Sequence, residues 1–130
     1  MKIHRALGPG FLESVYLNAL VHELRRAGFS AEVAQRITVR YENVIVGEFV
    51  ADLVVNDAVL CELKAISSLS KADEVQLVNY LVATHRDFGL LINFGSPSLQ
   101  FKRKYRHRVS DPAGVDLQHS VNRVNPVNPV

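Results

Sequence analysis

The chain has 130 residues, which at about 150 residues per domain leaves room for a single folded domain. Apolar residues make up 48% and charged residues 22%, a globular mixture that excludes wholesale disorder, and a net charge of +2 is by itself too small to indicate a polyanionic partner. One cysteine excludes an internal disulfide and a multi-thiolate metal site. Apolar runs fall far short of the roughly 18 residues that a membrane-spanning helix needs, and residues 1–5 lack the pattern of a secretory signal. We therefore expect a cytoplasmic protein without a membrane partner.

The N-terminal half of the chain predicts one helix and two strands. Apolar residues recur at steps of three and four across residues 11–28, with polar residues on the opposite side, which is typical of an amphipathic helix. Stretches rich in β-branched residues follow at 33–41 and 44–55. The turn-like pair Glu42 and Asn43 separates them, so we expect an antiparallel hairpin.

The second half predicts a third strand, a second helix and two further strands. Residues 58–64 follow another turn and predict the third strand of a meander. Ser70 is suited to cap a helix over about residues 71–85. Runs at 90–94 and 99–105, on either side of a Gly-Ser-Pro turn, predict two more strands. The order α-β-β-β-α-β-β predicts an α+β fold with a mixed central sheet flanked by helices.

The sequence changes in character near its C-terminal end. We expect residues 1–108 to form the single domain and residues 109–130, with their Asn-Pro-Val repeats, to form a flexible tail. Basic residues interleaved with Phe101 and Tyr105 precede this tail. They include Lys102, Arg103, Lys104 and Arg106. Such a segment can supply phosphate contacts and base stacking to a nucleic acid, or it can be an edge strand protected by its charges.

Charged residues on the third strand carry the main chemical signal. Glu62 and Lys64 are separated by one residue, so a strand places both side chains on one face. Folding about the turn at 56–57 can bring Asp52 beside Glu62. Two carboxylates and the Leu63 carbonyl suit Mg²⁺ or Mn²⁺, and the lysine can assist a coordinated water or neutralise charge on a phosphate. The spacing alone also allows ordinary cross-strand or exposed charge pairs, although the surrounding apolar run disfavours unpaired charges.

Three side chains on the two predicted helices are further candidates. Glu13 lies at the border of the first apolar stripe, where it can reach the carboxylates or simply favour the helix start through the macrodipole. Gln76 and Tyr80 share one face of the second helix, where they can hold a phosphate or the attacking water, or buttress the sheet. Cys61 alternates to the face opposite Glu62, and we expect it in the core.

Several motifs resemble one known family. Residues 10–16, GFLESVY, match the GxxExxY pattern of a family of small bacterial proteins, and LGPG at 7–10 is similar to the same family. That family belongs to the PD-(D/E)XK nuclease superfamily, whose α-β-β-β-α-β core agrees with the predicted order. In this resemblance Asp52 takes the place of the motif aspartate and residues 62–64 that of (D/E)XK, with Ala51 in place of the proline. QLVNY, from Gln76 to Tyr80, is similar to the Q-xxx-Y signature of exonuclease-like members.

The resemblance implies a restriction-endonuclease-like fold and a nuclease that uses Mg²⁺ or Mn²⁺ and acts on a nucleic acid, most naturally DNA. The catalytic residues that it implies are Glu13, Asp52, Glu62, Lys64 and Gln76. The implied metal ligands are Asp52, Glu62, the Leu63 carbonyl and Glu13. The implied nucleic-acid contacts are Tyr80, Lys102, Arg103, Lys104 and Arg106. A homodimer is compatible with a nuclease of one domain.

Two other functions remain open at this point. A non-catalytic module that binds a nucleic acid or a protein partner could retain the nuclease fold, since the chain is small and only modestly charged. A hydrolase that uses Asp52 and Glu62 as an acid–base pair is the poorer alternative, because it gives no role to Lys64 or to the basic segment.

Overall fold

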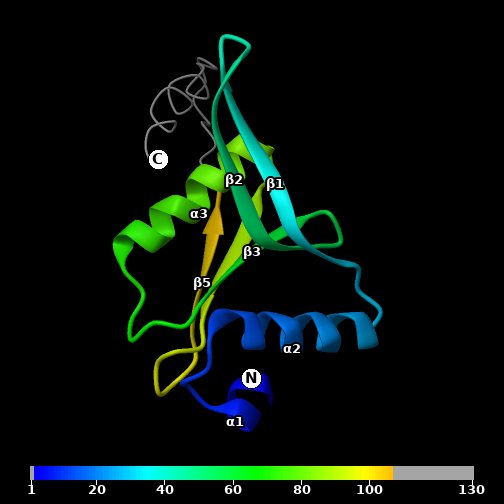
Figure 1. Ribbon diagram of the computed structural model, residues 1–130, viewed down its shortest axis with the longest axis vertical. Helices are drawn as coiled ribbons and strands as arrows, with labels where there is room; N and C mark the ends of the chain where they lie inside the picture. Colours follow the sequence, from blue (N-terminus) through cyan, green and yellow to red (C-terminus); the bar gives the residue numbers. More distant parts are fainter. Residues whose placement is uncertain (1, 107–130) are drawn as a thin grey trace.

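A computed structural model describes residues 2–106 of the chain. In these residues five strands form one sheet in the order β1-β2-β3-β4-β5, with helices packed on both faces (Figure 1). The elements in chain order are α1 (Lys2–Leu7), α2 (Glu13–Arg26), β1 (Ala31–Tyr41), β2 (Val44–Val55), β3 (Val59–Lys64), α3 (Lys71–Thr84), β4 (Phe88–Asn93) and β5 (Gln100–Tyr105). The predicted α+β fold is confirmed. Within the described residues no helix is long and apolar enough to cross a membrane. The predicted tail at 109–130 lies outside them.

The sheet is mixed because β3 and β4 run parallel, whereas the other neighbouring strands are antiparallel. Two parallel neighbours need a crossover connection, and α3 supplies it. The first three strands form the predicted meander. The chain then crosses one face of the sheet through α3 before β4 and β5 are added.

The elements lie where the hydrophobic patterns predict them, with small shifts at their ends. β1 begins at Ala31 and β4 at Phe88, each two residues earlier than the sequence predicts. The sequence pattern gives no sign of α1, because six residues are too few to show a helical period. At the turn between β1 and β2 the backbone is left-handed, with φ of 50° at Glu42 and 69° at Asn43. Two-residue turns of this kind match the twist of the strands they join.

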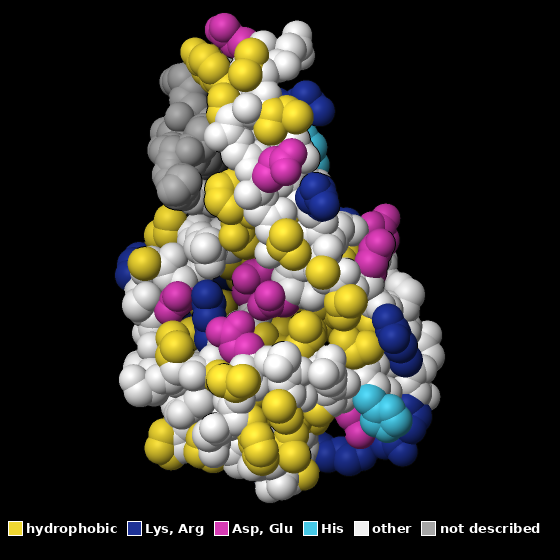
Figure 2. All heavy atoms as spheres, in the orientation of Figure 1, with side chains coloured by type: hydrophobic (Ala, Val, Ile, Leu, Met, Phe, Trp, Pro, Cys, Tyr) yellow, Lys and Arg dark blue, Asp and Glu magenta, His cyan; other side chains and the backbone are white. Residues whose placement is uncertain are grey.

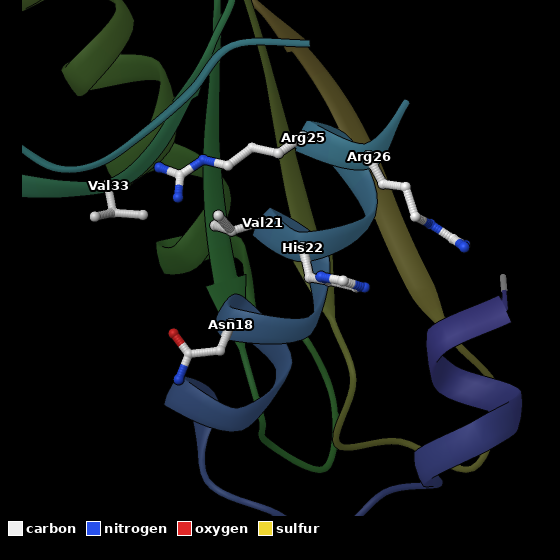
Figure 3. A pocket seen from close by; sticks show the side chains of 6 residues that line it. All are labelled: Asn18, Val21, His22, Arg25, Arg26 and Val33. Atoms are coloured by element: carbon white, nitrogen blue, oxygen red, sulfur yellow. The ribbon is translucent and has the colours of Figure 1, made fainter. Parts of the chain in front are cut away.

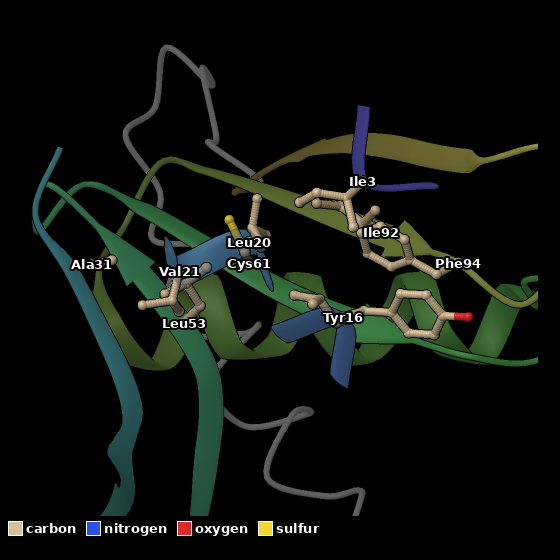
Figure 4. Packing of buried hydrophobic residues seen from close by; sticks show 10 residues of the cluster. Ile3, Tyr16, Leu20, Val21, Ala31, Leu53, Cys61, Ile92 and Phe94 are labelled. Carbon is tan, nitrogen blue, oxygen red and sulfur yellow. The ribbon is translucent and has the colours of Figure 1, made fainter. Parts of the chain in front are cut away.

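Two hydrophobic cores lie on opposite faces of the sheet. On the face covered by α1 and α2, the Tyr16 ring stacks on Phe94 with ring centroids 4.6 Å apart (Figure 4). On the face covered by α3, Leu77 and Leu81 pack against the sheet. Cys61 lies in the first core, as predicted, and its burial raises the pKa of the thiol to about 12. A thiol in this environment is unreactive.

The sheet opens between β2 and β3. β2 pairs with β1 along nearly its whole length, but it pairs with β3 only through residues 53–55 opposite residues 59–61. The rest of β2 leaves β3 and continues with β1 as a hairpin whose tip projects beyond the other elements (Figure 1). The two strands therefore part at Asp52, and the end of β3 keeps β4 as its strand neighbour.

Candidate active site

Asp52 and Glu62 meet at the point where β2 and β3 part. The Asp52 N–H donates to Glu62 Oε2 over 3.1 Å, and the Leu63 N–H donates to Asp52 Oδ2 over 2.7 Å. Because these bonds stand in for the missing ladder bonds, the backbone of each strand orients the carboxylate of the other. The structure thus places Asp52 beside Glu62, as the meander predicts.

The two carboxylates are poorly compensated by positive charge. Glu62 is only 6% exposed, and burial raises its pKa to about 8, with the charge of Asp52 as the next cause. Burial also raises the pKa of Asp52, although the bond from the Leu63 N–H opposes this effect. Within residues 2–106 the second oxygen of each carboxylate, Asp52 Oδ1 and Glu62 Oε1, accepts no hydrogen bond. These two oxygens are available to a ligand.

The motif at the start of α2 brings a third carboxylate to the pair. The Tyr16 hydroxyl donates to a backbone carbonyl of the preceding loop and accepts from the Phe11 N–H over 3.1 Å, which fixes the approach to the helix. Glu13 is the first residue of α2 and is exposed. Partial burial and then the charge of Asp52 raise the pKa of Glu13. Glu13 therefore belongs to the same electrostatic cluster.

Lys64 lies next to the carboxylates and also contacts α3. Its Nζ is 3.8 Å from Asp73 Oδ1, and both side chains are mostly buried. Asp73 in turn accepts from the Ser70 N–H over 2.8 Å in a capping box at the start of α3. The charge of Lys64 opposes the effect of burial on the pKa of Asp52 and Glu62. Figure 2 shows acidic and basic side chains grouped in the middle of the face, between the levels of α3 and α2.

The two candidates on α3 differ in position. Tyr80 is 8% exposed, and its ring packs against Phe49 of β2 with centroids 5.5 Å apart. Burial and then the charge of Glu62 raise the pKa of the Tyr80 hydroxyl to about 12, so this group lies near the carboxylates and keeps its proton. Gln76 is exposed and makes no hydrogen bond to another described residue. The structure brings Tyr80 to the carboxylates and leaves Gln76 at the surface of the helix.

The basic segment is divided between the two faces of β5, because side chains alternate along a strand. Lys102 and Lys104 point toward α3, where their Nζ atoms lie 3.9 Å and 2.9 Å from the carboxylate of Glu74. The Arg106 guanidinium lies 2.7 Å from Asp87 Oδ1. Arg103 is exposed on the alternate face of the strand and has no ion pair within residues 2–106. The four cations therefore do not form one continuous stripe.

The chain was compared with known proteins. Residues 1–104 match the family model of the PD-(D/E)XK nuclease superfamily. The chain belongs to this superfamily. Among solved structures it is similar to a chain titled "Crystal structure of SSO0001", with 14% identity and a TM-score of 0.58 over 85% of this chain and 54% of that one. This likeness shows the fold, and the present chain spans about half the length of that protein. A search of curated proteins found no match.

Members of the PD-(D/E)XK superfamily usually use a divalent metal. No group of three or more His, Cys, Asp or Glu side chains in the described part of the chain is arranged as a metal site. Asp52 and Glu62 nevertheless each offer an oxygen that accepts no hydrogen bond within residues 2–106. Mg²⁺ prefers oxygen ligands, often takes only one or two carboxylates and keeps several waters. The pair therefore fits a hydrated Mg²⁺ or Mn²⁺ ion.

Asn93, which the sequence analysis did not single out, fixes the backbone that follows Lys64. The Asn93 side chain is fully buried, donates to the Ile66 carbonyl over 2.9 Å and accepts from the Ile66 N–H over 2.9 Å. It also accepts from the Gly95 N–H over 3.0 Å and donates to Gln100 Oε1 over 3.0 Å. These bonds fix the loop that leads from β3 to α3. The available signal was a polar residue within an apolar strand.

Proposed function

We propose that the protein is a Mg²⁺- or Mn²⁺-dependent nuclease of the GxxExxY family that hydrolyses phosphodiester bonds in DNA. The interlocked pair of Asp52 and Glu62, with Lys64 beside it, carries this proposal. Burying two carboxylates side by side is costly unless a cation or a proton compensates them. An ordinary surface charge pair would lie exposed and would need neither burial nor hydrogen bonds to the opposite strand. The site therefore favours cation-assisted chemistry.

In this proposal the chain holds the ion and the attacking water. Asp52 and Glu62 would bind the cation together with the Leu63 carbonyl, and Glu13, which forms no three-carboxylate group with them in the described residues, would approach the ion through one of its waters. A bound divalent cation supplies a water of lowered pKa and neutralises charge on a phosphate. Lys64 adds a positive charge beside the reacting group, where it orients the water and stabilises negative charge that develops on the phosphate.

Residues of α3 and β5 would hold the rest of the nucleic acid. The Tyr80 hydroxyl stays protonated and can donate to a phosphate, and Gln76 can hold a phosphate or the water from the exposed side of the helix. The other proposed phosphate contacts are Lys102, Arg103, Lys104 and Arg106. Glu74 interacts with both Lys102 and Lys104, and also with Lys71, so positive charge remains in excess around this carboxylate.

We also propose that the protein is cytoplasmic and forms a homodimer. A cytoplasmic location fits a chain whose single cysteine is a buried free thiol. A homodimer would place two such sites on one duplex.

The test is cleavage of plasmid and oligonucleotide DNA, with RNA in parallel, in Mg²⁺, in Mn²⁺ and in EDTA. Lys64→Gln is expected to lower the single-turnover rate about 100-fold or more, because it removes a charge next to the reacting phosphate. Mn²⁺ binding should persist in this variant because both carboxylates remain. Lys2→Gln, at the exposed start of α1, removes a cation that pairs with Glu23 and lies outside the proposed site; it is the control and should cleave within a few-fold of the wild type.

Two outcomes of this assay would count against the proposal. Cleavage that persists in EDTA would show that no divalent metal is needed. DNA binding that weakens with salt but leads to no cleavage in any metal would instead support the non-catalytic module that retains the nuclease fold.

A further inference from the structure

A pocket of about 560 Å³ lies between α2 and β1, apart from the carboxylates of the candidate active site (Figure 3). The residues that line it are Asn18, Val21, His22, Arg25, Arg26 and Val33. None of them is acidic, and two are arginines. The charge of the lining therefore suits an anion.

Arg25 is the cation best placed to bind such an anion. Its Nη2 donates to the Ala31 carbonyl over 2.7 Å, which holds the guanidinium against the start of β1. No carboxylate pairs with Arg25 within residues 2–106. An arginine in the last turn of a helix often serves only to offset the helix dipole. The bond of Arg25 runs instead to another element, and it leaves other guanidinium N–H groups for a ligand.

The neighbouring Arg26, unlike Arg25, pairs with a carboxylate. Its guanidinium lies 2.9 Å from Glu23 Oε1, and Lys2 approaches the same oxygen at 3.4 Å. In Figure 3 Asn18, Val21 and Arg25 lie on the side of α2 that faces Val33, whereas Arg26 projects from another side. Asn18, Val21 and Arg25 are spaced to share one helix face. The part of the pocket that faces β1 thus combines a guanidinium with no ion pair among residues 2–106, an amide and two valine side chains.

We propose that this part of the pocket binds a backbone phosphate of the nucleic-acid strand whose scissile phosphate lies at Asp52 and Glu62. The inference rests on the proposed function, because it extends the same substrate away from the reacting group. Arg25 and Asn18 donate to the phosphate, and the sugar packs on the valine side chains. Arg25 follows Glu13 by twelve residues on α2, which is about 18 Å along a helix. At about 3.4 Å per stacked nucleotide, the two phosphates are about five nucleotides apart.

Such a contact recognises the backbone and not the base, so it predicts binding without sequence preference. It also predicts an effect on substrate affinity and none on the chemical step, because the pocket does not include the reacting groups.

The test measures DNA binding as a function of salt, and KM and kcat separately. Arg25→Gln is expected to weaken binding of a 12-nucleotide single strand several-fold and to reduce the slope of log K against log salt by about 0.7, the value for one phosphate contact. KM should rise by a similar factor while kcat stays unchanged. Arg5→Gln, which removes an exposed arginine of α1, is the matched control and should behave like the wild type.

A second variant separates the pocket from the fold. Asn18→Asp places a carboxylate in the pocket without touching the bond from Arg25 to Ala31, and it should weaken binding at least as much as Arg25→Gln. Thermal unfolding of each variant verifies that it is folded.

An unchanged salt slope and an unchanged KM in both variants would overturn this inference while leaving the proposed nuclease intact. Wild-type protein that binds DNA without cleaving it would refute the nuclease, and the salt slopes would still test the pocket. Wild-type protein that binds no DNA would overturn both.

Discussion

Glu62→Gln and Asp52→Asn are each expected to reduce metal-dependent cleavage at least about 1000-fold while the protein remains folded. The fold does not need either charge, since an amide oxygen in place of the Glu62 carboxylate can still accept from the Asp52 N–H. An amide oxygen in place of the Asp52 carboxylate can likewise accept from the Leu63 N–H. What each variant removes is one of the two negative charges that would hold the cation. Single-turnover cleavage of labelled DNA in Mg²⁺ and Mn²⁺ measures the effect.

The control for this prediction is Asp57→Asn. Asp57 is an exposed acid in the turn between β2 and β3, where it pairs with Arg86, so its replacement should leave cleavage unchanged. Full metal-dependent cleavage by Asp52→Asn or Glu62→Gln, in preparations free of contaminating nuclease, would show that the interlocked carboxylates are not the catalytic centre.

Glu62→Gln should also stabilise the metal-free protein at alkaline pH, by roughly 5 kcal/mol at pH 9, because a pKa raised from 4.5 to about 8 corresponds to about 1.4 kcal/mol for each unit. The folded state holds the Glu62 proton more tightly than the unfolded state does. The stability that this proton contributes is complete below about pH 4.5, declines as the pH rises, and is lost above about pH 8. A glutamine side chain carries no such charge, so the difference between variant and wild type should grow between pH 5 and pH 9. Urea unfolding in EDTA measures it.

The titration of other carboxylates does not obscure this comparison between pH 5 and pH 9. Asp52 and Glu13 also have raised pKa values, which adds to the loss of stability with rising pH in both proteins. Glu23 and Glu74 have lowered pKa values, so their contributions are lost only at acid pH. Saturating Mn²⁺ should reverse the order, because an ion that binds only the folded wild type stabilises it. A metal-free Glu62→Gln variant that is less stable than the wild type at pH 9 would mean that Glu62 is compensated by the protein itself.

Local patterns in the sequence predicted most of the fold. The β-branched runs on either side of Glu42 and Asn43 were sufficient for the β1–β2 hairpin, because a left-handed two-residue turn and alternating strands are local properties. The capping box at Ser70 predicted the start of α3 for the same reason. The adjacency of Asp52 and Glu62 followed from the meander alone.

Features that depend on tertiary contacts were not predictable. The separation of β2 from β3 at Asp52, which gives the site its location, leaves no mark in either strand's own residues. The basic run is continuous in the sequence. In the structure it is divided by the alternation of side chains along β5 and by the carboxylate of Glu74, which lies on α3, far from β5 in the sequence. The use of Asp73 both as a helix cap and as the partner of Lys64 likewise appears only when α3 is docked.

The pocket between α2 and β1 likewise depends on tertiary contacts and was not predictable from the sequence. Arg25 looks like an ordinary helix-ending arginine in the sequence, and only its bond to Ala31 reveals that it is fixed beside β1. The sequence therefore predicted residues that share a strand, a helix or a pair of strands joined by a turn, and it gave no sign of sites that form only when a helix packs against the sheet.

Calorimetric titration of Mn²⁺ tests the proposal that Asp52 and Glu62 bind a divalent cation, without relying on cleavage. The wild type should bind Mn²⁺ specifically at pH 7, with release of a proton, because burial holds Glu62 protonated up to about pH 8 in the metal-free protein. A folded Asp52→Ala/Glu62→Ala double variant should show neither the binding nor the proton release. Equal Mn²⁺ binding by the double variant, or no binding by the folded wild type with or without an oligonucleotide present, would contradict the claim.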